Sequence, residues 1–537
     1  MSHFIAKAFT AAQNAISRGI YIPKNLRDSL KAKPLPENAK ESSIKRRKGS
    51  KMYSDSDQQR PFFEPSNSSE EKQKEYRSEF RRDYGRIVHS PGFRRLQGKT
   101  QLFPSFESDF FRNRLTHSIE VAQIAKAIAT KINYEYFKDD RENRIDLDLI
   151  EVAALAHDMG HPPFGHQGEE ALNECMSEYG GFEGNAQTLR LLAKIEKKRM
   201  GGHLECGGFE GSEDKRFGLN LTYRALASVL KYDEVIPDRI PEKDGKFPIK
   251  KGYYKTETEL VGKIKSAISG KMDHKDFRTI ECWIMDIADD IAYSTFDLED
   301  AFKAGFINPI DIINLDHGFH EDVSERVNKE NSRKGIDTTV DPDMIIDIVS
   351  DLFKDSLFKL DIFEGLEEME KKFFETKEFK YLSVQYADRY SYFITKDGYA
   401  RAHFISQLVD AALSAVSFIK DEQIPALSKV ELKPDAQIRI EILKQIAFQT
   451  QILSPKLKIA EYRGKEIIKK IFDALVSSPG LLPGDIAQMY CQCGKGDEDL
   501  HRYRIICDYI ACMTDKYAIE LYGRLTSETP ETIFKPY

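Results

Sequence analysis

The stretch A-L-A-H-D-M-G-H-P-P-F-G-H-Q-G-E, residues 154–169, decides the fold of this 537-residue chain. It places His157 and Asp158 directly after an apolar, helix-favouring run and before a loop rich in proline and glycine. Two other pieces belong with it: R-L-T-H-S at 114–118 and I-A-D-D-I-A-Y-S-T-F-D at 287–297. Imidazole and carboxylate groups that converge on one point are typical of a metal site.

Each piece is expected on or beside a helix. Apolar residues recur at helical spacing after His117, and residues 149–156 form an apolar run that ends at His157. Asp289, Tyr293 and Asp297 are spaced by four residues, which would place them on one face of a helix. The candidate metal ligands are therefore His117, His157, Asp158 and a carboxylate at Asp289 or Asp290.

The order of the motifs resembles that of a known family. Besides the three pieces, the chain contains F-R-R-L-Q-G-K-T-Q-L-F-P at 93–104, F-E-G-N-A-Q at 182–187 and M-T-D-K-Y-A at 513–518. Over about residues 75–525 it resembles the HD-domain deoxynucleoside triphosphate triphosphohydrolases, in particular the bacterial dGTPase branch. The resemblance implies a mainly α HD-domain fold. It also implies hydrolysis of deoxynucleoside triphosphates, preferentially dGTP, to deoxynucleoside and inorganic triphosphate.

The resemblance assigns the metal and the catalytic groups. It favours Asp289 over Asp290 as the fourth ligand, because the family's ligand lies four residues before a tyrosine, here Tyr293. His166 would transfer a proton, a task for which histidine is suited near neutral pH. Glu169 would orient His166. His161 would contact phosphate or simply pack.

The resemblance also assigns substrate contacts. Arg114 and Lys231 would bind the triphosphate, and Tyr232 would lie near the nucleotide. Gln97 and Asp297 would hold the 3′-hydroxyl of the sugar. Tyr293 would pack under C2′ and exclude a ribose hydroxyl by steric conflict.

Composition and charge indicate the compartment of the protein and how its charge is distributed. The net charge is −7, but residues 1–60 carry 13 Lys and Arg against 5 Asp and Glu, so the remaining chain carries about −15. Seven cysteines without a framework spacing favour reduced thiols. No 18-residue apolar run and no signal-like start are present, so we expect a cytoplasmic protein without a membrane segment.

The domain organisation is expected to have three parts. Residues 1–74 would be an N-terminal extension and polar basic linker, and residues 75–305 the HD-domain catalytic core. Irregular or hairpin insertions are expected near 198–220 and 237–254. Residues 306–537 would be a helical C-terminal region that completes the site and makes oligomer contacts, with helices predicted at 346–360, 402–419 and 440–453.

Cofactor, partners and alternatives follow from the same resemblance. One divalent ion per subunit is expected, Mn²⁺ or Mg²⁺, with Fe²⁺ or Ni²⁺ also compatible with the ligands. The resemblance further implies a homo-oligomer, a tetramer or hexamer, with single-stranded DNA or a nucleotide as a possible regulator. The alternatives are a broad-specificity triphosphohydrolase, another HD phosphohydrolase, and a nucleic-acid-binding or regulatory HD protein.

Overall fold

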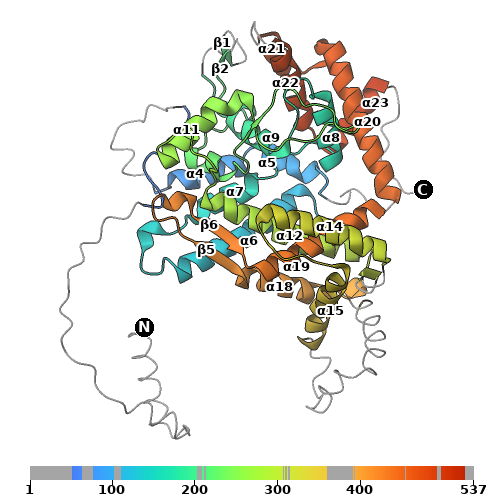
Figure 1. Cartoon of the computed structure of the whole chain (residues 1–537). Coiled ribbons are helices and arrows are strands. Elements are labelled where there is room, and N and C mark those ends of the chain that lie inside the picture. Colours follow the sequence, from blue (N-terminus) through green and yellow to red (C-terminus); the bar gives the residue numbers. More distant parts are fainter. Residues whose placement is uncertain are drawn as a thin grey trace, which may run out of the picture. The chain divides into compact units, whose positions relative to one another are not determined.

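The computed structural model describes residues 51–526 except for several short stretches and one longer one (Figure 1). The gaps are 63–75, 102–110, 202–207, 211–212, 306, 309–310, 313–314, 360–390, 392–393, 454 and 493–497. The described chain is mainly helical, so the predicted fold class is confirmed. The basic run at 45–48 lies outside the described residues.

Three mutually packed helices form the centre of the fold: α6 (Arg114–Glu135), α7 (Leu147–Ala156) and α12 (Ile280–Ala304). Asn113 caps α6 by accepting a hydrogen bond from the backbone of Thr116, whose side chain bonds back to Asn113. The apolar run predicted at 149–156 lies within α7 and is buried. These three helices are the ones that the three sequence pieces predict.

Shorter elements surround this centre. The helices are α4 (Glu79–Val88), α5 (Pro91–Arg95), α8 (Gly165–Cys175), α9 (Gly184–Arg190), α10 (Tyr223–Ser228) and α11 (Thr258–Ser269). Strands β1 (Phe209–Glu210) and β2 (Glu213–Asp214) pair antiparallel in the first expected insertion. Strand β3 (Val235–Ile236) directly precedes the second expected insertion and pairs in parallel with β4 (Tyr253–Tyr254) at its end. In the described segment that separates β3 from β4, the only antiparallel bridge joins Lys243 to Lys246.

The following region covers one side of α12. It contains α14 (His317–Lys334), α15 (Pro342–Lys359), α18 (Gly398–Ser414) and α19 (Pro434–Leu453), and α19 packs directly on α12. Strands β5 (Val416–Ile419) and β6 (Lys429–Leu432) form an antiparallel pair between α18 and α19. The prediction of a helix through 402–419 is therefore wrong for its last four residues, because V-S-F-I finds a strand partner.

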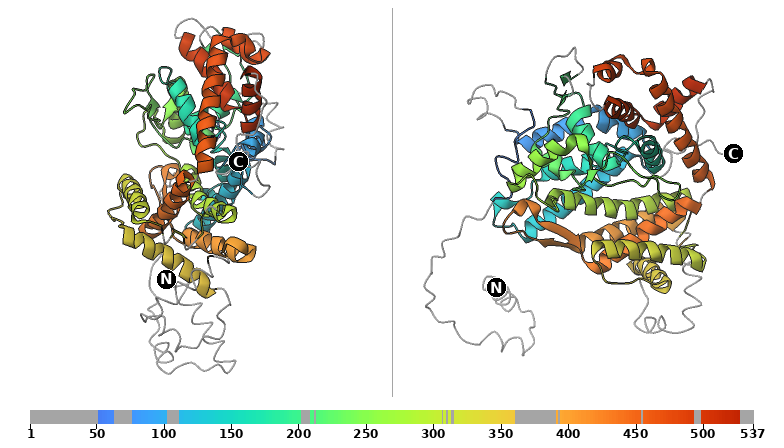
Figure 2. Two further views of the ribbon diagram at one scale, coloured as in Figure 1. Left: turned by 90° about the vertical axis from the view of Figure 1, so that its right-hand side faces the viewer. Right: turned by 45° about the horizontal axis from the view of Figure 1, so that its top comes forward.

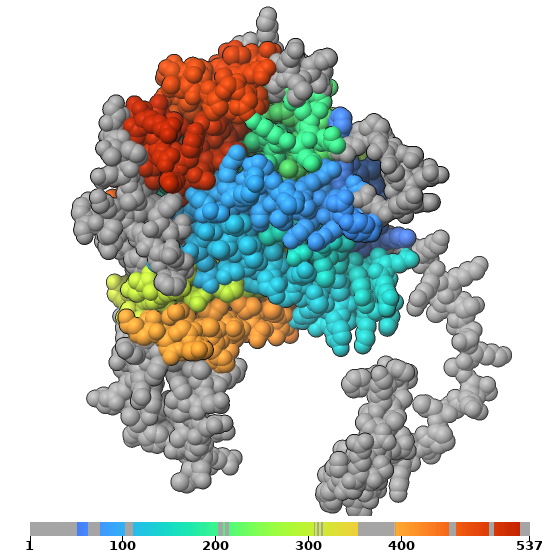
Figure 3. Space-filling model, turned by 180° about the vertical axis from the view of Figure 1, so that it is seen from behind, coloured from blue at the N-terminus to red at the C-terminus, as the bar shows by residue number. Residues whose placement is uncertain are grey.

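The C-terminal helices lie together on the side of α8. They are α20 (Pro455–Ser477), α21 (Gly484–Gln492), α22 (Glu498–Ala511) and α23 (Asp515–Thr526), drawn in orange to red in Figure 2. Helix α20 packs against both α8 and α23. From behind, the blue segment near α5 lies against these red helices (Figure 3).

Residues 51–62 belong to this packed unit, although the sequence suggested a linker there. Met52 and Asp57 are buried, and the Tyr53 hydroxyl donates a 2.8 Å hydrogen bond to Glu281 on α12. Arg224 also binds Glu281, and the side chains of both residues are fully buried. No described helix is long and apolar enough to span a bilayer.

Candidate active site

The central helices bring four candidate metal ligands together. His117 lies in the first turns of α6, His157 and Asp158 directly follow α7, and Asp289 lies in the middle of α12. Ligand atoms of His117, His157 and Asp158 all lie within 4.8 Å of one another. Oδ1 of Asp289 lies 3.0 Å from Nε2 of His117 and 3.6 Å from Nε2 of His157. Two imidazoles and two carboxylates therefore face one point.

The hydrogen bonds of His157 suit a metal ligand. Its Nδ1–H donates to the carbonyl oxygen of Ala154 at 2.6 Å, because a carbonyl can only accept. This bond fixes the ring and leaves Nε2, which is buried without a hydrogen-bond partner among the described residues, directed to the carboxylates. The residues present thus fit a divalent ion with nitrogen and oxygen ligands.

The buried charges in this cluster shift one another's pKa values. Burial lowers the pKa of His157, but the negative charges of Asp158 and Asp289 outweigh it and raise the pKa to about 9. For Asp158, burial acts to raise the pKa, yet Arg114 and His161 hold it well below its usual range. Arg114 reaches Oδ2 of Asp158 at 2.5 Å. The carboxylates are therefore ionised at neutral pH, as ligands to a cation must be.

Asp290, the alternative to Asp289, is paired with two lysines. Its Oδ1 lies 2.7 Å from Nζ of Lys444, and its Oδ2 lies 3.1 Å from Nζ of Lys334. Both oxygens are thus paired with cations on α19 and α14. This geometry favours Asp289 as the fourth ligand.

His166 and Glu169 form a pair on the first turns of α8. Nδ1 of His166 lies 3.3 Å from Oε2 of Glu169, whose other oxygen accepts the backbone N–H of Gly184 at 2.8 Å. Burial acts to raise the pKa of Glu169, but the hydrogen bond from His166 and the charge of Lys251 lower it. An ionised Glu169 requires the proton on Nδ1 of His166, so Nε2 is the ring atom available for chemistry. His161 lies between the two clusters, with Nδ1 3.0 Å from Oδ1 of Asp158.

All of these groups line one cavity of about 380 Å³. Lys231 also lines it, and its Nζ lies 2.5 Å from Asp286. Burial acts to lower the pKa of Lys231, but Asp286 raises it well above its ordinary value, so this lysine remains charged. The predicted residues that line the cavity are Arg114, His117, His157, Asp158, His161, His166, Glu169, Lys231, Tyr232, Asp289, the alternative Asp290, and Tyr293.

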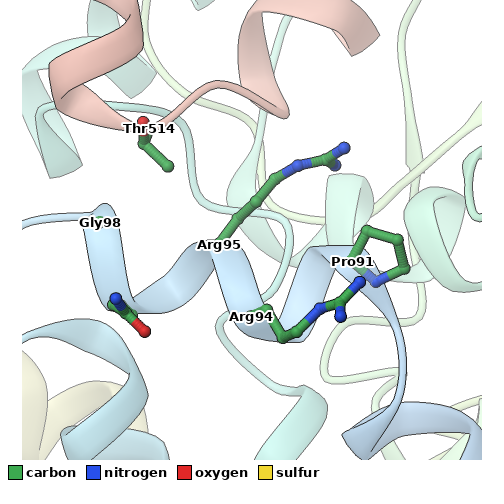
Figure 4. A pocket seen from close by; sticks show the side chains of 6 residues that line it. Pro91, Arg94, Arg95, Gly98 and Thr514 are labelled. Atoms are coloured by element: carbon green, nitrogen blue, oxygen red, sulfur yellow. The ribbon is translucent and has the colours of Figure 1, made fainter.

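Gln97 is not brought into this cavity. Residues 96–98 form a short 3₁₀ turn after α5, and the side chain of Gln97 is exposed. It lines a separate hollow of about 390 Å³ with Arg94, Arg95 and Thr514 (Figure 4). The assignment of the 3′-hydroxyl to Gln97 therefore has no support in the geometry.

Gln101, four residues further on, lines the cavity that Gln97 does not reach. The backbone N–H of Arg114 donates to the carbonyl of Lys99, which holds this segment beside the start of α6. Gln101 lines the cavity, and its Oε1 is buried without a hydrogen-bond partner in the described part of the chain. Glutamine recurs at both positions of the quoted run, and the sequence could not distinguish them without knowing where the 3₁₀ turn ends.

Asp297 is fully buried and does not line the cavity. It lies two turns after Asp289 on α12, as the four-residue spacing predicts. Neither of its carboxylate oxygens has a hydrogen-bond partner among the residues described. Burial raises the pKa of Asp297 to about 7, and the charge of His117 opposes that rise.

Sequence reasoning missed several residues that line the cavity. Asn185 belongs to the quoted F-E-G-N-A-Q motif, so its signal was present but no role was given to it. The others carry no recognisable spacing, and α14 and α19 bring most of them to the site from the C-terminal half. They are Lys251, Arg326, Lys444, Gln445 and Phe448.

Comparison with known proteins agrees with this geometry. The HD domain family matches residues 114–207, and the phosphohydrolase-associated domain matches residues 430–524. Deoxyguanosinetriphosphate triphosphohydrolase-like protein 2 of Mesorhizobium japonicum is 42% identical over 496 residues, which cover 90% of this chain and 100% of that protein. The chain belongs to the HD-domain deoxyguanosinetriphosphate triphosphohydrolase-like family.

More distant members of this family give the same result. The deoxyguanosinetriphosphate triphosphohydrolase-like protein of Shewanella pealeana is 31% identical over 493 residues, covering 85% of this chain and 94% of the relative. That of Aliivibrio fischeri is 31% identical over 507 residues, covering 87% and 97%. The chain is thus a hydrolase with an HD phosphohydrolase domain, a domain type that binds divalent metal ions.

Proposed function

We propose that this protein hydrolyses deoxynucleoside triphosphates, preferentially dGTP, to deoxynucleoside and inorganic triphosphate. One observation carries the proposal: four metal-type ligands, the His166–Glu169 pair and several cations line a single cavity. The relatives, named as deoxyguanosinetriphosphate triphosphohydrolase-like proteins, support the same reaction.

The proposed reaction breaks the bond between the α-phosphorus and the 5′-oxygen. A divalent ion held by His117, His157, Asp158 and Asp289 would polarise the α-phosphoryl group. Water adds to the phosphorus, and the 5′-oxygen leaves with a proton from His166. Glu169 would orient the His166 ring through its contact with Nδ1, which leaves Nε2 to carry the transferred proton.

Fixed cations on the cavity wall would bind the triphosphate. Arg114 is buried against Asp158, and Lys231 is held by Asp286. Lys251 is held by Glu183 at 2.9 Å, so its ammonium is also pre-positioned. Cations held in this way stabilise charge on phosphate oxygens without reorganising during the reaction.

The remaining walls suit a deoxynucleoside. Tyr293 follows the ligand Asp289 by one turn and lines the cavity, which supports its role in excluding a 2′-hydroxyl. At another wall the guanidinium of Arg326 lies 5.3 Å from the centre of the Phe448 ring, next to Gln445. An aromatic face beside hydrogen-bonding groups suits a purine base, and arginine matches the acceptors of guanine.

Product analysis separates this function from the alternatives. The protein is incubated with dGTP and Mn²⁺ or Mg²⁺, with GTP and the other deoxynucleotides in parallel, and the products are resolved by ion exchange. Deoxyguanosine with intact triphosphate supports the proposal. Equal rates for all four deoxynucleotides favour a broad-specificity enzyme, while diphosphate or monophosphate products favour another HD phosphohydrolase.

We also propose that the protein is cytoplasmic and forms a homo-oligomer, either a tetramer or a hexamer. Single-stranded DNA or a nucleotide would regulate its activity. Light scattering after gel filtration measures the assembly. Titration of single-stranded DNA at two salt concentrations, with turnover as readout, tests regulation, because backbone binding weakens steeply with salt. Unchanged turnover at both salt concentrations counts against DNA as a regulator.

A further inference from the structure

The M-T-D-K-Y-A motif at 513–518 has no place in the site described so far, although it belongs to the family signature in the sequence. Its aspartate, Asp515, is the first residue of α23 and is fully buried. Its side chain does not line the cavity. A buried carboxylate is costly unless it is hydrogen-bonded, so its partners indicate what it does.

Asp515 joins two segments that lead into the cavity. Its Oδ1 accepts the backbone N–H of Phe164 at 3.0 Å. Its Oδ2 accepts the backbone N–H and the hydroxyl of Thr100, at 2.8 and 2.6 Å. Phe164 stands two residues before His166, and Thr100 directly precedes the cavity residue Gln101.

The backbone at Phe164 is strained. Its φ of 63° and ψ of 24° are left-handed, and Gly165 follows with a φ of 56°. For a bulky residue the left-handed conformation costs about 1–2 kcal/mol, and it persists only where the surroundings enforce it. This pair of residues turns the chain into α8, so the turn sets the position of His166 in the first turn of that helix.

The turn at Phe164 and Gly165 is closely packed against neighbouring backbone. A Cβ on Gly464 of α20 would lie 3.0 Å from the Cβ of Phe164. A Cβ on Gly168 would lie 1.9 Å from the carbonyl oxygen of Pro163. Nearby, the ammonium of Lys99 donates to the carbonyls of His161 and Ala511, which ties the same loop to α22.

We propose that Asp515 is a positioning residue for His166. Its hydrogen bond to Phe164 holds the left-handed turn, and its bonds to Thr100 anchor that turn to the segment carrying Gln101. The C-terminal helices thereby fix the proton-transfer histidine relative to the cavity. This inference rests on the proposed function, because it takes His166 to be the proton donor.

A double-mutant cycle tests this role. Asp515→Asn leaves one carboxamide oxygen for the three groups that donate to Asp515, the N–H of Phe164 and the N–H and hydroxyl of Thr100. At least one of the contacts to Phe164 and Thr100 is therefore lost. A displacement of about 1 Å in a catalytic group can lower turnover by about 100-fold, so we expect kcat for dGTP to fall by about 10- to 100-fold. The bound metal should stay unchanged, and kcat should change by a larger factor than KM, because His166 acts in the chemical step. In an H166A background, Asp515→Asn should change kcat by less than about twofold.

Asp83 offers a matched control on α4. It is also fully buried, and its Oδ2 accepts the backbone N–H and hydroxyl of Thr222, at 2.9 and 2.8 Å, while its Oδ1 accepts from the guanidinium of Arg60 at 2.6 Å. It does not line the cavity. Asp83→Asn should lower the melting temperature as Asp515→Asn does, while kcat of the folded enzyme stays unchanged.

A second variant perturbs the same turn without removing a buried charge. Gly165→Ala places a Cβ in a left-handed backbone, where the nearest atom outside the turn is 3.4 Å away on Arg114. If Asp515→Asn does not fold, Gly165→Ala takes its place in the cycle, with the same expected loss of effect in the H166A background.

The outcomes are distinguishable. An equal loss of kcat from Asp515→Asn with and without His166, or full turnover in Asp515→Asn, overturns the positioning role. Full turnover in H166A alone removes His166 from the mechanism and this inference with it. If the unmodified protein releases no triphosphate from dGTP, the proposed function fails whatever the cycle shows.

Discussion

Asparagine substitutions at the neighbouring residues Asp289 and Asp290 of α12 should have different effects on metal binding. Asp289 lies 3.0 and 3.6 Å from ring nitrogens of His117 and His157, whereas Asp290 binds Lys444 and Lys334. Asp289→Asn therefore removes a metal ligand, and Asp290→Asn removes only the counter-charge of two lysines. The two variants are matched in chemistry and differ by one position.

The magnitudes follow from these environments. Loss of a residue that only supports a ligand weakens metal binding by about 10- to 100-fold, so loss of a ligand should cost about 100-fold or more, or about 3 kcal/mol. For Asp290, the side chains of Lys334 and Lys444 are 34% and 31% exposed, and such pairs contribute at most about 1 kcal/mol each. Asp290→Asn should thus lower stability by about 1–2 kcal/mol and leave metal binding within about threefold.

Two measurements check this pair. Metal content after gel filtration is determined by mass spectrometry, and turnover of dGTP is followed against Mn²⁺ concentration. We expect the activation constant for Mn²⁺ to rise by about 100-fold in Asp289→Asn only. If Asp290→Asn loses the metal while Asp289→Asn keeps it, the ligand assignment is refuted.

Four further predictions follow from the same structure. His166→Ala should retain metal and nucleotide binding but lose turnover by about 100-fold or more, measured by steady-state kinetics; full activity would remove His166 from the mechanism. Tyr293→Ala should raise the kcat/KM for GTP relative to dGTP, and an unchanged ratio would refute steric exclusion of the 2′-hydroxyl. Arg224→Met should lower the free energy of unfolding by about 3–5 kcal/mol, because it leaves the buried carboxylate of Glu281 without its cation. Denaturant titration measures this loss, and a value below about 1 kcal/mol would contradict the prediction. Burial lowers the pKa of Lys99 to about 8, below its ordinary value of 10.5. Between those two pH values the unfolded chain therefore binds more protons than the folded chain. As the pH rises from 8 to 10.5, the free energy of unfolding of the wild type should increase by up to about 3 kcal/mol relative to that of Lys99→Met. A constant difference between the two proteins would show that the pKa of Lys99 is not shifted.

The helices that carry the candidate ligands were predictable from sequence because their signals are local. The apolar run of α7 ends at His157, and the spacing from Asp289 to Asp297 matches one face of α12. The structure adds what spacing could not supply. The resemblance favoured Asp289 over Asp290, and the structure adds that Asp290 binds lysines that α14 and α19 bring from more than forty residues away.

Other parts of the site depend on contacts between distant segments. The 3₁₀ turn at 96–98 takes Gln97 outward and leaves Gln101 at the cavity, which the motif alone could not decide. Phe448 and Arg326 reach the wall through helix packing, without any pattern of their own. The strand at Val416–Ile419 forms because β6 pairs with it, and that partner lies ten or more residues further along the chain.

The most direct test of the central claim is the identity of the products formed from dGTP. Purified protein with Mn²⁺ or Mg²⁺ is incubated with dGTP, and the phosphate products are separated by ion exchange. We predict deoxyguanosine and intact inorganic triphosphate in equal amounts. Release of diphosphate or monophosphate, or no product with either metal, would contradict the account.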